Sequence, residues 1–185
     1  MIRNDWWATP VWEIQTPFDE VFNNQLLVEF EEYDGPRSNL TYNIWKAPGK
    51  NIAILRDYTA DIVKRATEEF IKPAWGNADF EHKRGWVNHN MPGQSIPVHC
   101  HGTPQIAMTY YVKAPKDCGD LLLIDPRGGA ISWDMGMDTV SGSKFNRIKA
   151  QEGKLVFFPA FILHSVEANK SNLPRVSLSS NMGTK

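Results

Sequence analysis

Three of the five histidines fall in two short segments whose spacing suits a metal site. His99 and His101 flank a single residue, and His164 comes much later in the chain. Residues i and i+2 of an extended strand point to the same face, so the first two imidazoles can converge. Imidazole suits iron, copper, nickel and zinc, and a returning strand could supply His164 as a third ligand. The pattern predicts a metal centre with open positions, against the simpler alternative of surface or hydrogen-bonded histidines.

A basic side chain near the C-terminus could hold a carboxylate. In the segment 175–179, alternation places Arg175, Ser177 and Ser179 on one face of a strand and apolar residues on the other. An inward guanidinium needs an anionic partner, arginine matches a carboxylate bidentately, and a nearby hydroxyl adds a hydrogen bond. Arg175 and Ser177 therefore suit the distal carboxylate of a dicarboxylic cosubstrate. The alternative is an exposed arginine on an edge strand.

Four further polar residues could contact a substrate, with less support from the pattern. Asn88, Asp125 and Arg127 are three of them, although 125–129 is more typical of a structural turn that closes one end of a barrel. Asn181 follows Arg175 on the same alternation. These four residues are the weaker site predictions.

The remaining histidines and the cysteine between the ligand candidates have simpler interpretations. His82 and His89 have no partner at ligand spacing, so we expect surface groups. Cys100 should point away from the metal centre and pack. With only one other cysteine, Cys118, the chain has too few for a disulfide scaffold.

The elements that must position these residues divide into a helical first half and a strand-rich second half. A loose edge strand over 8–15 precedes a helix that Pro17 and Asp19 open and that 34–36 ends. A longer helix carries apolar residues at helical spacing from Asn51 to Phe70, and Pro73 should end it.

Seven short strand-like runs follow, separated by turn residues: 86–90, 105–113, 120–124, 130–133, 145–149, 154–158 and 175–180. Many short strands without intervening helices indicate an antiparallel sandwich or barrel. We therefore expect an α+β, mainly β fold, best matched by a double-stranded β-helix (a cupin-like jelly roll) with N-terminal helices packed on one face. A single domain over 1–185 would comprise a helical support region, 1–84, and a jelly-roll core, 85–181.

Composition and charge exclude several classes of protein. A chain of 185 residues suits one domain with one substantial core. Its net charge of -1, from 20 basic and 21 acidic residues, predicts no nucleic-acid partner, and no segment resembles a signal peptide or a membrane span. We expect a cytoplasmic protein, in the host cytoplasm if the chain is phage-encoded. A homodimer is compatible with the sequence.

From residue 85 to 181 the chain resembles the 2-oxoglutarate/Fe(II) oxygenase superfamily. It is more closely similar to a group of small oxygenases, found in bacteria and phages, that look like prolyl 4-hydroxylases. The order and spacing of the shared motifs make the resemblance specific. They are Trp86-Val87-Asn88, the H-x-H at His99 and His101, Tyr110-Tyr111-Val112, Gly119-Asp120-Leu121, Asp125-Pro126-Arg127, Gly153 to Pro159, His164-Ser165-Val166 and Arg175-Val176-Ser177.

The resemblance implies a ligand set for iron. His99 and His164 correspond to the two histidine ligands, and His101 stands where the superfamily usually has a carboxylate. Iron held by three neutral imidazoles would carry one more positive charge than in the usual site.

The resemblance also implies a cosubstrate site and a reaction. Arg175 and Ser177 correspond to the clamp for 2-oxoglutarate, and Tyr111 to a tyrosine that helps hold the same carboxylate. The implied cofactors are Fe(II), 2-oxoglutarate and O2, and the implied reaction is hydroxylation of an unidentified substrate, with a peptidyl residue such as proline as one candidate. Trp86, Ile106, Met108 and Phe158 are expected to give the pocket an apolar lining, and 130–146 to form a lid.

Two other functions remain open on the sequence. One is a three-histidine, cupin-like metal dioxygenase that does not use 2-oxoglutarate. The other is a non-catalytic jelly roll that binds sugar or protein through exposed aromatic side chains.

Overall fold

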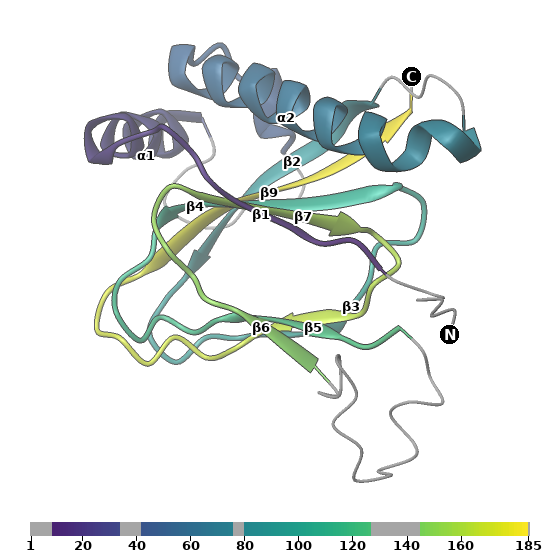
Figure 1. The fold of residues 1–185 in the computed structure, drawn as a ribbon. Helices are drawn as coiled ribbons and strands as arrows, with labels where there is room; N and C mark the ends of the chain where they lie inside the picture. The colour runs from purple at the N-terminus through teal and green to yellow at the C-terminus, as the bar shows by residue number, and fades with distance from the viewer. Residues whose placement is uncertain (1–8, 34–41, 76–79, 127–144, 185) are drawn as a thin grey trace, which may run out of the picture.

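A computed structural model of the chain describes residues 9–33, 42–75, 80–126 and 145–184. Two antiparallel sheets face each other, and the helices α1 (Glu20–Tyr33) and α2 (Lys50–Trp75) cover the outer face of the larger sheet (Figure 1). A short 3-10 helix, η1 (Ile44–Lys46), precedes α2. None of the helices in these ranges is both long and apolar enough to cross a membrane.

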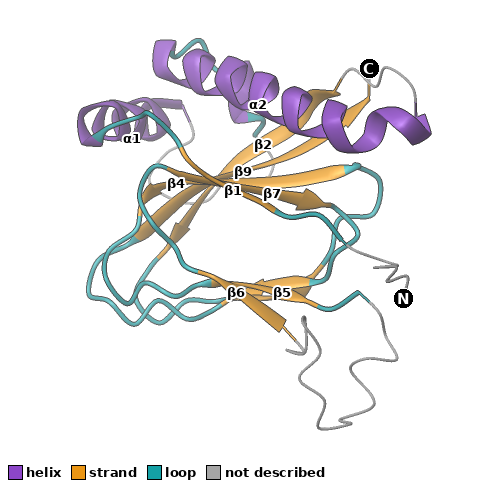
Figure 2. Ribbon diagram, in the orientation of Figure 1, coloured by secondary structure: helices purple, strands orange, loops and turns teal. Residues whose placement is uncertain are grey.

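The larger sheet has five strands and the smaller has four, all paired antiparallel (Figure 2). The order in the larger sheet is β1 (Trp12–Gln15), β7 (Lys154–Pro159), β4 (Ile106–Lys113), β9 (Arg175–Thr184) and β2 (Phe80–Asn90). The order in the smaller sheet is β3 (Ile96–His99), β8 (His164–Val166), β5 (Leu121–Ile124) and β6 (Phe145–Ile148). Strands distant in sequence therefore lie side by side, as a jelly roll requires. The predicted α+β, mainly β class is confirmed.

Alternation along β4 divides the apolar residues between two cores. Ile106, Met108 and Tyr110 pack beneath the helices, whereas Ala107 and Tyr111 belong to a second apolar cluster between the sheets. Successive side chains of a strand point to opposite faces, so one strand supplies both clusters. The central strands β4 and β9 consequently carry a packed face and a face turned toward the smaller sheet.

The helix boundaries follow from capping groups. The Asp19 carboxylate accepts a hydrogen bond from the Phe22 N–H at 2.9 Å, which places the start of α1 where the sequence predicted it. The predicted end of α2 was wrong, because the helix continues past Pro73 to Trp75. A proline this near the C-terminus removes only one hydrogen bond of the last turns.

Six of the seven predicted strands correspond to β2, β4, β5, β6, β7 and β9, and the run 130–133 lies outside the described residues. The edge strand predicted over 8–15 is the shorter β1. Neither β3 nor β8 was among the predicted runs, and β8 has only three residues, too few for an alternating pattern to be visible.

Candidate metal centre and its pocket

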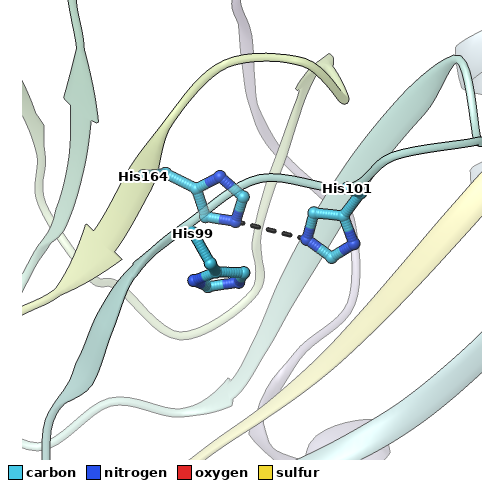
Figure 3. Close-up of side chains that lie close together, drawn as sticks. All are labelled: His99, His101 and His164. Atoms are coloured by element: carbon cyan, nitrogen blue, oxygen red, sulfur yellow. Dashed lines mark hydrogen bonds between the residues drawn. The ribbon is translucent and has the colours of Figure 1, made fainter.

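The three histidines converge because two short strands of the smaller sheet pair beside them (Figure 3). His99 ends β3, His164 begins β8, and the two are direct partners in the antiparallel register. His101 lies just beyond β3, where its backbone N–H donates to the Ala160 carbonyl at 3.0 Å. The convergence predicted from the H-x-H spacing is therefore present.

The ring nitrogens lie close enough to share one ion. His101 Nε2 and His164 Nε2 are 3.3 Å apart, and one ligand nitrogen from each histidine lies within 4.8 Å of the other two. Two imidazole nitrogens that bind one metal ion at about 2.1 Å and at right angles are separated by about 3 Å. The described histidines thus fit a divalent transition metal.

Backbone carbonyls orient two of the rings. His99 Nδ1 lies 2.8 Å from the Pro97 carbonyl, and His164 Nδ1 lies 2.8 Å from the Ile162 carbonyl. A carbonyl can only accept, so each Nδ1 carries the proton and each Nε2 keeps a free lone pair. This is the tautomer that a metal ligand bound through Nε2 needs.

Burial favours the neutral form of His164 and His101. Desolvation lowers the pKa of His164 to about 4, despite the opposing hydrogen bond to the Ile162 carbonyl. Desolvation, with a smaller contribution from His99, also lowers the pKa of His101. Neutral imidazoles present lone pairs at neutral pH, so protons compete little with a metal ion.

A pocket of about 1280 Å³ opens beside the histidines. Its wall on the larger sheet is built from alternate residues of β2 and β9, which face each other in register and on the same side of the sheet. The four facing pairs are Arg84 with Asn181, Trp86 with Ser179, Asn88 with Ser177, and Asn90 with Arg175. The Trp86 ring stacks near His101, with centroids 5.9 Å apart, so the metal centre lies beside the second pair.

Arg175 lies at one end of this wall as a buried cation. It is 1% exposed, and its Nη1 donates to the carbonyls of Cys118 at 2.8 Å and Gly119 at 2.9 Å. In the part of the chain that the structure describes, it forms no salt bridge. Desolvation lowers its pKa, because burial disfavours an uncompensated charge. A bound anion would relieve that cost.

The two other residues predicted for the cosubstrate line the same pocket. Ser177 is 6% exposed, and Tyr111 faces it across the β4–β9 pairing. Burial raises the pKa of Tyr111, so its phenol stays protonated and can donate a hydrogen bond. The structure therefore brings Arg175, Ser177 and Tyr111 together.

The weaker site predictions have mixed outcomes. Asn88 and Asn181 both line the pocket; Asn88 Nδ2 donates to Ser179 Oγ at 2.9 Å. The buried Oδ1 of Asn181 has no hydrogen-bond partner among the described residues. Arg127 lies outside those residues, as does most of the predicted lid, and Asp125 is not among the pocket-lining side chains.

Four expectations were wrong. His82 is not a surface group, because its ring lies beneath α2 with bonds to Ser180 Oγ at 2.8 Å and Thr59 Oγ1 at 3.0 Å. His89 is half-buried and lines the pocket. Cys100 is exposed and does not pack. Ile106 faces the core beneath the helices, because β4 turns its even-numbered residues that way.

Sequence reasoning also missed Arg84 as a pocket residue. The predicted strand began at Trp86, whereas β2 begins at Phe80. The signal was present, since Arg84, Trp86, Asn88 and Asn90 occur at every second position.

Comparison with known proteins gives one family and many similar folds. The family described as "Putative 2OG-Fe(II) oxygenase" matches residues 84–181, more than half of the chain. No curated protein matches the sequence.

Several solved structures resemble the chain along most of its length. A Pseudomonas putida prolyl-4-hydroxylase has 14% identity and a TM-score of 0.67, over 96% of this chain and 94% of that one. The non-heme alpha ketoglutarate dependent carbocyclase SnoK from nogalamycin biosynthesis has 12% identity and a TM-score of 0.69, over 94% and 80%. HygX from Streptomyces hygroscopicus, with nickel and 2-oxoglutarate bound, has 12% identity and a TM-score of 0.63, over 96% and 83%. At these identities the likeness concerns the fold, and it confirms the predicted double-stranded β-helix.

Proposed function

Because the chain belongs to the 2OG-Fe(II) oxygenase family that matches residues 84–181, we propose that it hydroxylates its substrate with Fe(II), 2-oxoglutarate and O2. Fe(II) and 2-oxoglutarate are the metal and cosubstrate of this family. One observation carries the proposal: a single pocket contains a cluster of three imidazoles and, at one end of its wall, a buried arginine without a salt bridge among the described residues.

His99, His101 and His164 would hold the metal ion. The carbonyls of Pro97 and Ile162 fix the rings of His99 and His164 with Nε2 free, which supports their role as ligands. Three ligands leave positions for other groups on an ion that accepts six, as in the open sites of non-haem iron oxygenases.

Arg175, Ser177 and Tyr111 would hold the distal carboxylate of 2-oxoglutarate. The Cys118 and Gly119 carbonyls hold Nη1 of Arg175, which leaves its other donors for an anion. Ser177 and the protonated Tyr111 add hydroxyl donors on the same wall. The carboxylate would neutralise the cation that burial otherwise penalises.

When bound, the metal and cosubstrate supply the oxidation: 2-oxoglutarate, O2 and a substrate C–H give succinate, CO2 and the hydroxylated substrate. The chain's own residues hold and orient the reactants. Apolar side chains, among them Leu121, Phe158 and Val166, line the pocket beside the histidines and exclude water from them. A prolyl residue is one substrate candidate, because a structural neighbour is a prolyl-4-hydroxylase.

Anaerobic titration tests the proposal. Fe(II) followed by 2-oxoglutarate should produce a visible charge-transfer band that saturates at one cosubstrate per chain. Stoichiometric Fe(II) binding with no band and no 2-oxoglutarate binding, in protein shown to be folded, would instead support the three-histidine dioxygenase that acts without 2-oxoglutarate.

A further inference from the structure

We propose that the substrate presents a carboxylate and an N–H group on one carbon, and that Arg84 and Asn181 bind this pair at the end of the pocket opposite Arg175. A free α-amino acid and the C-terminal residue of a peptide both carry that chemistry. The inference rests on the proposed function, because it assigns the other end of the pocket to 2-oxoglutarate.

Arg84 is the anion-binding half of the pair. It lines the pocket and forms no salt bridge within the described residues, and its side chain is exposed, in contrast to Arg175. An exposed guanidinium at the pocket suits a molecule that arrives from solvent. A buried one suits a cosubstrate that binds first and deeper.

Asn181 is the half that accepts an N–H. It stands directly opposite Arg84 in the β2–β9 register, so the two side chains project from neighbouring points on the pocket face. Its Oδ1 is buried and has no partner among the described residues, and an unsatisfied buried acceptor is costly until a donor arrives. A carboxylate acceptor and an N–H donor on one carbon match this neighbouring cation and acceptor.

The position of the pair relative to the metal centre separates it from the cosubstrate site. Arg84 and Asn90, the partner of Arg175, are six residues apart on β2, about 20 Å at 3.3 Å per residue. Trp86, which stacks near His101, lies between them. A five-carbon cosubstrate cannot span that wall, and a pocket of about 1280 Å³ exceeds what one small ligand fills.

The charge of the pocket favours an anionic substrate. Its described lining contains two arginines and no aspartate or glutamate. Three neutral imidazoles also leave the full charge of a divalent ion uncompensated by protein. The two carboxylates of 2-oxoglutarate offset only part of this positive charge, so an anion at Arg84 is electrostatically favoured.

Binding measurements on the protein loaded with Fe(II) and 2-oxoglutarate, without oxygen, test the inference. The probes are the twenty protein L-amino acids, each as the free acid, the N-acetyl acid, the α-amide and the N-acetyl amide. We expect calorimetry to show that at least one amino acid binds in a form with a free carboxylate. The two amide forms of that amino acid should bind at least on the order of tenfold more weakly. Preference for the free acid identifies an amino-acid substrate, and preference for the N-acetyl acid identifies a peptide C-terminus.

Matched variants locate the binding. Arg84→Gln should weaken the affinity for the best probe by on the order of tenfold to a hundredfold, and Arg84→Lys should weaken it less. Lys83→Gln is the control, because it removes a charge from the same strand outside the pocket lining, and it should leave the affinity almost unchanged. Asn181→Ala should weaken the affinity for that probe. It should leave unchanged the affinity for the corresponding carboxylic acid that lacks the amino group.

Three results would overturn the inference. The first is that no probe binds, and the second is that the amides bind as tightly as the acids. The third is that Arg84→Gln leaves the affinity for the best probe unchanged, which is the result expected if the amino acid binds the metal ion directly. The affinity for 2-oxoglutarate in the same samples reports the proposed function separately. If it is intact while the probes fail, only the substrate assignment is wrong.

Discussion

Two backbone carbonyls prepare His99 and His164 for a metal ion, whereas no carbonyl of the described residues does the same for the His101 ring. Instead, His101 Nε2 lies 3.3 Å from His164 Nε2. A hydrogen bond between these two nitrogens would use the lone pair that a metal needs, whereas an ion between them would use both lone pairs. His101 is therefore the residue on which the three-histidine ligand set depends most.

His101→Gln should weaken metal binding by at least on the order of tenfold, because removing even an outer partner of a ligand has that effect. His89→Gln is the matched control, since His89 lines the pocket outside the cluster. Anaerobic Fe(II) titration gives both affinities. Equal affinities in wild type and His101→Gln would leave a two-histidine site.

Arg175→Gln should weaken the affinity for 2-oxoglutarate by on the order of tenfold to a hundredfold, because a charged hydrogen bond to the carboxylate is lost. The metal affinity should stay unchanged. Arg65→Gln is the control, as Arg65 is exposed on α2, where it pairs with Asp61. Circular dichroism establishes that each variant is folded; a folded Arg175→Gln protein with wild-type cosubstrate affinity would rule out the clamp.

Among the elements, the junction of α2, β2 and β9 carries a buried polar network on the side of the sheet away from the pocket. His82 bonds to Ser180 and Thr59, and the Trp45 indole also donates to Ser180 Oγ at 2.9 Å. A β-bulge between His82 and Arg84 turns these two residues to opposite faces although they are two positions apart. The same strand thus supplies a pocket cation and a buried histidine.

Because of His82, the free energy of unfolding should decrease as the pH is lowered. Desolvation lowers the pKa of His82 to about 4, whereas the unfolded histidine titrates near 6.5. The folded state then binds fewer protons between these values, so this contribution is full above pH 6.5 and is lost at about 1.4 kcal/mol per unit as the pH falls toward 4. Urea unfolding of the metal-free protein at several pH values between 7 and 5 gives the free energy of unfolding as a function of pH. This dependence on pH should be weaker for His82→Asn than for wild type, and equal dependences would contradict the assignment.

A side chain of α1 caps the N-terminus of α2. The Glu29 carboxylate of α1 accepts from the backbone N–H groups of Asn51 at 3.0 Å and Ile52 at 2.9 Å, at the start of α2. Glu29→Ala should lower the free energy of unfolding by about 1–2 kcal/mol, in the range of lost helix caps. Glu68→Ala, at an exposed position of α2, is the control and should change it little. Similar denaturation midpoints for Glu29→Ala and wild type would show that the cap contributes nothing.

At the scale of the whole molecule, much of the site could be read from the sequence because strands impose a period of two. That period placed His99 with His101, and Arg175 with Ser177 and Asn181. Arg84 continues this period but was missed, because the polar start of β2 does not look like a strand and the predicted strand began at Trp86. The burial of His82 was not revealed, since the bulge between His82 and Arg84 interrupts the pattern.

The pairing of distant segments could not be derived from local pattern at all. That β3 lies against β8, and β2 against β9, depends on how the two sheets close around the pocket. The periodicity alone was compatible with several kinds of β-sandwich. The resemblance of residues 85–181 to known oxygenases selected the jelly roll among them. The two sheets then contribute different parts of the site, with the metal cluster on the smaller and Arg175 on the larger.

A crystal structure of the protein grown without oxygen, with Fe(II) and 2-oxoglutarate, tests this division most directly. We expect one metal ion bound by His99, His101 and His164, and one 2-oxoglutarate that joins the metal to Arg175 across the pocket. A metal ion outside the histidine cluster, or 2-oxoglutarate bound away from Arg175, would contradict the central claim.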